Sequence, residues 1–271
     1  KGVSAQGNLT IMGDRLVLAG GNVVSPASFD LQTGRCLDQP RPQGQPQSNG
    51  GKFVGVFDGK FAIAGGRILH SSPRNVSTKG SFNVWSPGKR PQTLNYGGIP
   101  PAWNDDLLAV ANFKYGPIVA IDRDTLSKRL EGGIANPDAP RNRFANNIAT
   151  SMTTRSEDRW NTNLGDSSKF ETVSLAASPN AVVAVARFQD LRRAKPAWTL
   201  LALAADNGRP IVQQELPGEP LPGGLLINRH GHILVTLLDG TVVCYSPPPP
   251  GTPAPRRPDA APRRSDAAPG R

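Results

Sequence analysis

The chain has 271 residues, of which 37% are hydrophobic and 6% aromatic, with 29 Gly and 27 Pro. This composition suits short strands joined by many turns. It argues against a mainly helical fold, because no stretch of about 12 residues keeps helical apolar spacing without Gly or Pro. The net charge of +10 favours acidic partners in general. No Lys/Arg run exceeds a pair, so we expect no specific nucleic-acid site, and no apolar run is long enough to span a membrane.

In chain order, the first feature is an internal repeat. Gly13–Gly21 and Asp58–Gly66 share a polar turn, a basic residue, four apolar residues and a double glycine. Related apolar segments follow, and taking Leu16, Phe61, Leu107, Val182 and Ile233 as equivalent gives spacings of 45, 46, 75 and 51 residues. A period near 45 is typical of the four-stranded blade of a β-propeller.

The flanks of each apolar segment complete the predicted blade. A short apolar stretch and a turn precede the segment, as at 53–59, and indicate a hairpin whose Asp and Gly tolerate positive φ. A third strand ending in a polar turn follows, as at 29–35 and 203–209, and 211–216 is the best example of an outer fourth strand. We expect the continuous apolar strands to be buried on both faces between neighbouring blades.

Two stretches fall outside this pattern. Residues 132–169 lengthen one repeat interval and are rich in polar residues, which predicts a long loop insertion fastened to the surface by Trp160. From residue 246 to 271 the chain holds four consecutive prolines and two copies of Ala-Pro-Arg-Arg-X-Asp-Ala, with five Arg and two Asp. Such a segment is predicted to be a disordered tail. The predicted domains are therefore 1–245, the blades, and 246–271.

The repeats resemble those of the PQQ-binding-like (quinoprotein-like) β-propeller proteins of the bacterial envelope. The resemblance rests on Leu201–Pro210 and on Phe29–Leu37, which are similar to the family's Ala-Leu-Asp-Ala-x-Thr-Gly-Lys turn, and on Gly231–Tyr245, which resembles the companion half. It implies an all-β propeller, with 7 or 8 blades usual for the family, so the five repeats would be a C-terminal portion. It also implies a periplasmic, envelope or secreted location.

The chain departs from the enzymes of that family. It lacks the adjacent Cys-Cys pair of the quinone-dependent dehydrogenases, and the docking Trp that ends each blade is mostly absent, its place in the fourth unit falling near Val212 or Gln213. Apolar packing is therefore expected to hold the blades together. No catalytic residue, metal ligand or cofactor can be assigned, and whether the chain is an enzyme stays open.

Other candidate residues are interpreted structurally. His230 and His232 flank Gly231 and are expected to be exposed in a turn rather than to bind a metal. The carboxylate pairs Asp105-Asp106 and Asp122-x-Asp124 are expected to cap turns. Sequons occur at Asn8 and Asn75, where chance matches are common. Cys36 and Cys244 lie in the first and last units and would meet in a disulfide only if five blades closed into a ring.

These observations favour a monomeric, non-catalytic propeller domain that presents loops to a protein or polymer partner. Two alternatives stay open. The chain could be part of a quinone-dependent oxidoreductase whose active-site residues lie in other blades. It could also bind an anionic polymer through its Arg-rich tail, because clustered arginines attract polyanions.

Overall fold

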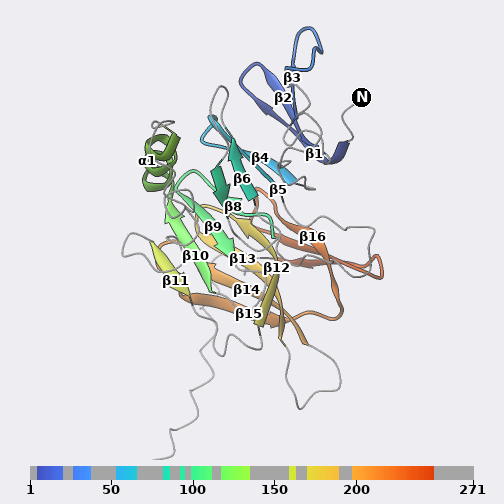
Figure 1. Ribbon diagram of the computed structural model, residues 1–271. Helices are drawn as coiled ribbons and strands as arrows, with labels where there is room; N and C mark the ends of the chain where they lie inside the picture. Colours follow the sequence, from blue (N-terminus) through green and yellow to red (C-terminus); the bar gives the residue numbers. More distant parts are fainter. Residues whose placement is uncertain are drawn as a thin grey trace, which may run out of the picture.

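The computed structural model describes residues 5–20, 27–37, 53–65, 82–85, 92–94, 99–111, 117–134, 159–162, 170–188 and 197–246. The regular elements in these ranges are β-strands and one helix, and the strands form five antiparallel sheets (Figure 1). In every sheet the strands lie side by side in their order along the chain. This meander is the topology of a propeller blade, so the expectation of an all-β, propeller-type fold is confirmed.

The sheets have three or four strands each. The first contains β1 (Ala5–Met12), β2 (Arg15–Gly20) and β3 (Ala27–Asp30). The second contains β4 (Phe53–Phe57), β5 (Phe61–Gly65), β6 (Phe82–Trp85) and β7 (Gln92–Leu94). The third contains β8 (Ala102–Trp103), β9 (Leu107–Ala111), β10 (Ile118–Asp122) and β11 (Trp160–Thr162), with helix α1 (Arg123–Ile134) between the last two. The fourth contains β12 (Phe170–Ala177), β13 (Ala181–Phe188), β14 (Ala197–Ala204) and β15 (Pro210–Glu215), and the fifth β16 (Pro220–Ile227), β17 (Ile233–Leu237) and β18 (Val242–Tyr245).

Four clusters of buried apolar side chains hold the sheets together, and each lies between two sheets that follow one another in the chain. Met12 and Val17 meet Val54 between the first and second sheets. Phe57 meets Leu108 between the second and third. The largest cluster joins the third sheet to the fourth, and the last joins the fourth to the fifth. The apolar second strands of the second, third and fourth sheets are buried on both faces, as predicted, because β5, β9 and β13 each supply side chains to two clusters. In the first and fifth sheets, β2 and β17 supply side chains to one cluster each.

The turns also follow the prediction. Asp58 and Gly59 both have positive φ, at 53° and 62°, so the β4–β5 hairpin uses two left-handed residues. After the third strand, Asp30 accepts hydrogen bonds from the backbone and hydroxyl of Thr33, and Gly34 follows with φ of 68°. Gly208, at the equivalent place in the fourth sheet, has φ of 69°. The two copies of the family-like turn therefore share one backbone conformation.

The structure differs from the prediction between 123 and 169. Residues 132–169 were expected to form an inserted loop, but Trp160–Thr162 form strand β11, which pairs with β10 as the outer strand of the third sheet. Asp122-x-Asp124 was expected to lie in a turn, but the chain continues there from β10 into helix α1, although the sequence showed no helical pattern. In the parts of this interval that the structure describes, the extra residues lie between the third and fourth strands of one blade.

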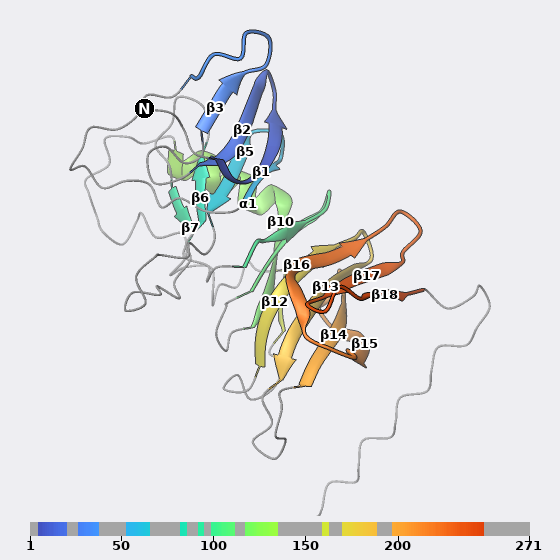
Figure 2. The ribbon, with the colours of Figure 1, turned by 90° about the vertical axis from the view of Figure 1, so that its right-hand side faces the viewer.

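The five sheets follow one another around an arc, and the first and fifth sheets lie at its two ends (Figure 2). The main contacts between sheets join neighbours in sequence: β1 with β4, β12 with β8 and β9, and β12 with β16. Within the described ranges, no helix has the length and apolar character needed to cross a membrane.

Candidate functional site

The first strands of all five sheets line one cavity of about 540 Å³. Its walls come from β1, β4, β8 with the two residues before it, β12 and β16. A cavity that touches the same strand of every repeat lies on the axis around which the repeats are arranged. We call it the axial cavity. It is the place where the propeller arrangement brings distant parts of the chain together.

The axial cavity is mostly apolar, and none of the described residues that line it is ionisable. The lining residues are Asn8, Thr10, Phe53, Val54, Gly55, Val56, Pro100, Pro101, Ala102, Trp103, Ser174, Leu175, Ala177, Gly223 and Leu225. Acid–base or nucleophilic chemistry needs titratable or activated groups within reach of a substrate. The described wall supplies none, so it can bind through shape and apolar contact but has no evident means of acid–base chemistry.

Trp103 is the largest side chain in the cavity wall, and its position is fixed by its neighbours. The indole packs edge-on against Phe53 and Phe57, with ring centroids 6.1 and 6.3 Å apart. It also lies against the backbone of Gly55, where an added Cβ would be 2.3 Å from an indole carbon. The indole therefore occupies space that only a glycine leaves open, which makes it a rigid apolar surface at the axis.

Two of the polar residues in the wall hold neighbouring first strands together. The Asn8 side chain accepts a hydrogen bond from Val54 N at 2.9 Å and donates one to Val54 O at 2.5 Å, so its amide joins the first sheet to the second. The Ser174 hydroxyl accepts a hydrogen bond from Gly223 N at 2.9 Å, which joins the fourth sheet to the fifth. The side-chain amide of Asn8, which lies in a glycosylation sequon, is thus engaged in two hydrogen bonds within the protein.

A second set of polar residues lies near the turns that join first and second strands, a part of the molecule that we call the rim. The Arg123 guanidinium donates two hydrogen bonds to Asp58 Oδ1, at 2.7 and 3.1 Å, and Ser127 donates one to Oδ2 at 2.9 Å. These bonds, the arginine's above all, hold the pKa of the Asp58 carboxyl below its usual value. Arg123 also donates to the carbonyl of Asp105. The β4–β5 turn, the β8–β9 turn and the start of α1 are therefore tied together.

The other carboxylates and histidines lie where local structure uses them. The β8–β9 turn is capped by the Asn104 side chain rather than by Asp105 or Asp106, as had been expected. Asn104 Oδ1 accepts a hydrogen bond from the backbone N–H of Asp106, and its Nδ2 donates one to the carbonyl of Ser178 in the next sheet. Asp122 ends β10 and pairs with Arg159 at 2.7 Å, and Asp124 lies in the first turn of α1 rather than in a strand-to-strand turn.

His230 is exposed in the β16–β17 turn and His232 is half-buried there, with ring centroids 6.2 Å apart. Asn228 accepts hydrogen bonds from the backbone N–H of both histidines, which matches the expected turn. Among the described residues there is no group of three or more metal-binding side chains. Cys36 and Cys244 are both exposed and are not joined by a disulfide.

Sequence reasoning did not find the axial cavity. Asn8 was noted only as part of a sequon, and Trp103 and Arg123 carried no signal. One clue was available for two of them: Asn8 and Trp103 both lie on the first strand of a repeat. Residues that recur at one place in every blade meet at the axis or on one rim of a propeller.

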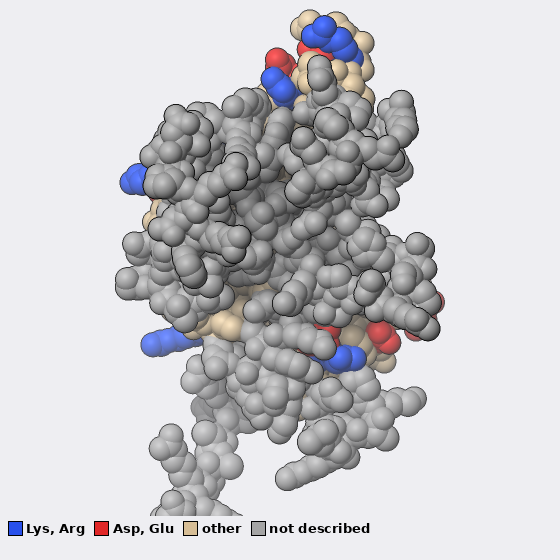
Figure 3. Space-filling view, in the orientation of Figure 1, with Lys and Arg blue, Asp and Glu red and all other residues tan. Residues whose placement is uncertain are grey.

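The described basic residues form no continuous patch on the face of Figure 3, where Lys and Arg atoms lie in separate groups and some are beside Asp or Glu. The Arg-rich tail lies outside the described residues.

The described wall of the axial cavity does not fit the PQQ and Ca²⁺ that the quinone-dependent dehydrogenases of the resembled family bind. PQQ is an anionic quinone, and the family's enzymes hold it with a Ca²⁺ ion bound by carboxylate and amide groups. Among the described residues of the wall there is no carboxylate and no basic side chain, and the side-chain amide of Asn8 is hydrogen-bonded to Val54. No reaction step through this cofactor follows from these residues.

No protein-family model matches the chain, and no curated protein matches it in sequence. It is similar to several solved structures. BamB from Moraxella catarrhalis is 12% identical, over 91% of this chain and 71% of that one, with a TM-score of 0.42. The β-propeller domain of Cps50 (Swd1) from Myceliophteria thermophila is 14% identical, over 93% and 68%, with a TM-score of 0.47. A luciferin-regenerating enzyme is 9% identical, over 89% and 73%, with a TM-score of 0.46. Because these TM-scores are below 0.5, the fold is defined here by the chain's own strand order.

Proposed function

We propose that this chain is a non-catalytic, propeller-type binding module whose axial cavity takes an uncharged, apolar portion of a partner protein. The observation that carries the proposal is the composition of the cavity wall, where five first strands converge and no described lining residue is ionisable. Apolar ligand sites are concave, largely pre-formed and lined by aromatic and aliphatic side chains. The wall has this character, with Trp103 fixed by Phe53 and Gly55.

The proposal refines the role expected from the sequence, which placed partner contacts on rim loops and in particular on residues 132–169. On the rim, the Asp58–Arg123 pair joins two turns of the chain itself, whereas the axial cavity offers apolar surface that no described side chain fills. An envelope or secreted location, expected from the family resemblance, is part of the proposal.

A charged side chain in the cavity wall tests the proposal. Thr10 lines the cavity and is half-buried, so Thr10→Arg places a cation at the site without removing a core side chain. Gln213→Arg, on the exposed strand β15, is the matched control with the same charge. The probes are an environment-sensitive apolar dye and synthetic peptides that are uncharged and apolar, acidic or basic.

Saturable binding of the dye and of the apolar peptides is expected, with a change in Trp103 fluorescence that the Trp103→Phe variant lacks. Thr10→Arg should weaken this binding about tenfold or more, since burying an unpaired charge against an apolar ligand is costly, and Gln213→Arg should leave it unchanged. Stronger binding of charged peptides, indifferent to Thr10→Arg, would disprove the proposed ligand class.

The Arg-rich tail supports one alternative, because residues 246–271 hold five Arg and two Asp and so carry a net charge of +3. Binding of an anionic polymer through these arginines would fall steeply with salt. Heparin-type polyanions titrated at several salt concentrations, with the full chain and a variant ending at residue 245, distinguish this role from the cavity. An equal salt slope for both proteins would remove the tail from consideration.

A further inference from the structure

The two sheets at the ends of the arc each expose an apolar face. In the first sheet, Leu9 and Ile11 of β1 are 58% and 62% exposed. They pair directly with Leu18 and Leu16 of β2, so these four leucine and isoleucine side chains share one face. The opposite face of the same sheet carries Met12, Val17 and Ala19, which pack against the second sheet.

The fifth sheet repeats this arrangement at the other end. Leu226 of β16 is 59% exposed and pairs with Leu234 of β17, which pairs with the exposed Cys244 of β18. Val242, on the same face as Cys244, is 56% exposed. The opposite face, with Val235 and Leu237, is buried against the fourth sheet.

Both exposed faces continue an interface that the structure already contains. Val183 and Val185 of β13 face the fifth sheet. Because Val182 and Ile233 are equivalent in the repeat, the corresponding residues of β17 are Leu234 and Thr236, which belong to the exposed face. Val54 and Ala62 face the first sheet, and the corresponding face of the first sheet carries Leu9 and Ile11. Each end therefore presents the surface that, elsewhere in the chain, is covered by the next or the preceding sheet.

The two end faces are complementary to each other by the same logic. In each interface of the arc, one sheet contributes the face directed toward the next sheet in the chain, and that next sheet contributes the face directed back toward it. The fifth sheet exposes a face of the first kind, and the first sheet exposes a face of the second kind. Stacked repeats normally cover their ends with polar caps, because an exposed apolar repeat face invites association. Surfaces of two different kinds on one chain associate head to tail.

We propose that the exposed face of the fifth sheet binds the exposed face of the first sheet in a second copy of this chain. The joint extends the arc across the two chains and buries Leu226 and Val242 of one copy against Leu9 and Ile11 of the other. It replaces the monomer expected from the sequence, and it does not depend on what the axial cavity binds.

The test uses one blocked face per variant. Ile11→Lys blocks the first-sheet face and Leu226→Lys blocks the fifth-sheet face, and both side chains are already exposed, so neither change disturbs a buried cluster. Ile211→Lys is the matched control, because Ile211 is 57% exposed but lies on β15, the outer strand of the fourth sheet. Molecular mass is measured by sedimentation and light scattering up to about 100 µM, a range that detects the weak association common at small interfaces.

The wild-type chain and Ile211→Lys are expected to reach at least twice the mass of the chain as concentration rises. Ile11→Lys and Leu226→Lys should each stay monomeric alone. Mixed together they should form a 1:1 dimer, because each still has the one face that the other lacks. In a Cys36→Ser background, alkylation of Cys244 should slow severalfold as the wild-type faces associate.

Several outcomes would overturn the proposal. A wild-type chain that is monomeric throughout would show that another sheet, from a different protein or a longer polypeptide, covers these faces or that nothing does. Dimerisation of Ile11→Lys alone would indicate that the fifth sheet pairs with itself, and dimerisation of Leu226→Lys alone would indicate the same for the first. Loss of association in Ile211→Lys would point to a different surface.

Discussion

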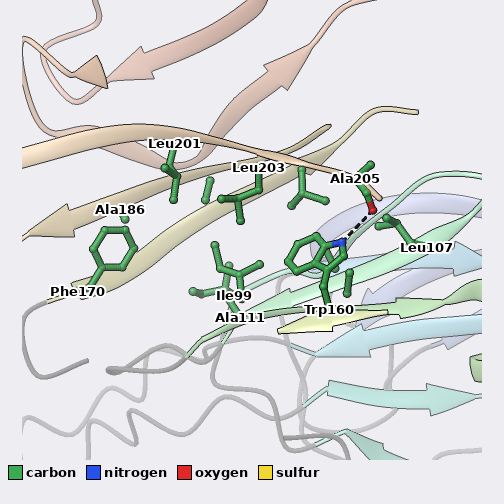
Figure 4. Close-up of a cluster of buried hydrophobic side chains, with 14 residues drawn as sticks. Ile99, Leu107, Ala111, Trp160, Phe170, Ala186, Leu201, Leu203 and Ala205 are labelled. Atoms are coloured by element: carbon green, nitrogen blue, oxygen red, sulfur yellow. Dashed lines mark hydrogen bonds between the residues drawn. The ribbon is translucent and has the colours of Figure 1, made fainter. Parts of the chain in front are cut away.

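The indole nitrogen of Trp160 donates a 2.8 Å hydrogen bond to the backbone carbonyl of Ala205, across the boundary between the third and fourth sheets (Figure 4). Next to it, the Thr162 hydroxyl donates to the carbonyl of Gly208 at 2.7 Å. Trp160 is 7% exposed and belongs to the largest buried cluster. The outer strand of one blade is therefore fastened to the turn that ends the third strand of the next.

This contact adds to what the sequence led us to expect at the boundaries between blades. The docking tryptophans of the resembled family were expected to be mostly absent, and apolar packing was expected to hold the blades together. Trp160 adds a hydrogen bond to the apolar packing between the third and fourth sheets, and it lies on β11, a strand within the stretch that was expected to be a loop. The sequence predicted that Trp160 fastens this stretch to the surface, but it predicted neither the strand β11 nor the bond to the Ala205 carbonyl.

Removing the indole should weaken the boundary between the third and fourth sheets. Trp160→Ala deletes a buried aromatic side chain and should lower the free energy of unfolding by about 3 kcal/mol. Trp160→Phe keeps much of the apolar contact and loses the hydrogen bond, so a loss of about 1 kcal/mol is expected. Urea unfolding followed by circular dichroism measures both.

Gly208→Ala provides an independent check of the same contact. Gly208 has φ of 69°, and an added Cβ would lie 2.4 Å from the Thr162 hydroxyl oxygen and 2.6 Å from indole carbons of Trp160. The alanine should therefore destabilise by about 2 kcal/mol through both strain and overpacking. In the Trp160→Ala background the same substitution should cost less. Equal costs in both backgrounds would contradict close packing at this site.

The sequence predicted the blades well because each repeat carries its own local signals. An apolar second strand recurs in every repeat, and turns such as Asp58-Gly59 and Thr33-Gly34 lie beside several of the strands. Both signals depend only on residues close together in the chain. Gly34 and Gly208, which adopt the same positive φ, are an example. Strand order followed directly, since a meander pairs each strand with the next.

The axial cavity and the ties between sheets could not be predicted in this way. Asn8 bonds to Val54 and Arg123 to Asp58, at sequence separations of 46 and 65 residues, and nothing in the local sequence marks either pair. The helix α1 was missed because Gly132 and Gly133 interrupt its pattern, yet its first turn is held by Arg123 and Ser127 on Asp58. Tertiary contacts here outweigh local propensity.

The Asp58–Arg123 pair should make stability depend on pH in acid. The pKa of Asp58 is lowered in the folded protein from an ordinary value of 3.8, mainly by its hydrogen bond to Arg123. A depressed carboxyl pKa stabilises the fold at pH values above the unfolded pKa, and this contribution is lost as pH falls through the folded pKa. The difference in unfolding free energy between wild type and Asp58→Asn should therefore be constant above about pH 5 and shrink below about pH 4.

Asparagine is the appropriate replacement because it keeps the size of the side chain and tolerates the positive φ of Asp58. At neutral pH the loss is expected to be about 1–2 kcal/mol, since the pair is partly exposed to solvent. Asp14→Asn, at an exposed carboxyl in the corresponding turn of the first sheet, is the control and should show little change at any pH. A difference for Asp58→Asn that persists unchanged at pH 3 would argue against the charged pair.

Gly55 should be the least replaceable residue of the cavity wall. An alanine Cβ at this position would lie 2.3 and 2.8 Å from two indole carbons of Trp103, which Phe53 and Phe57 hold from other sides. Gly55→Ala should displace the indole, shift the Trp103 fluorescence and destabilise the fold by about 1–3 kcal/mol. If Trp103→Phe is introduced first, the penalty should fall, because the smaller ring leaves room. An undiminished penalty would place the strain elsewhere.

Thr172 and Ser174, two residues apart on β12, should respond to removal of their hydroxyls in opposite ways. Thr172 is 1% exposed, and among the described residues its hydroxyl has no hydrogen-bond partner, whereas the Ser174 hydroxyl accepts a bond from Gly223 N. A buried hydroxyl without a partner costs its desolvation, and valine has the same shape without that cost. Thr172→Val should therefore stabilise the protein by about 1 kcal/mol, while Ser174→Ala should destabilise it by a similar amount. Urea unfolding of the two variants decides the matter, since a clear loss of stability in Thr172→Val would mean that its hydroxyl is bonded in solution.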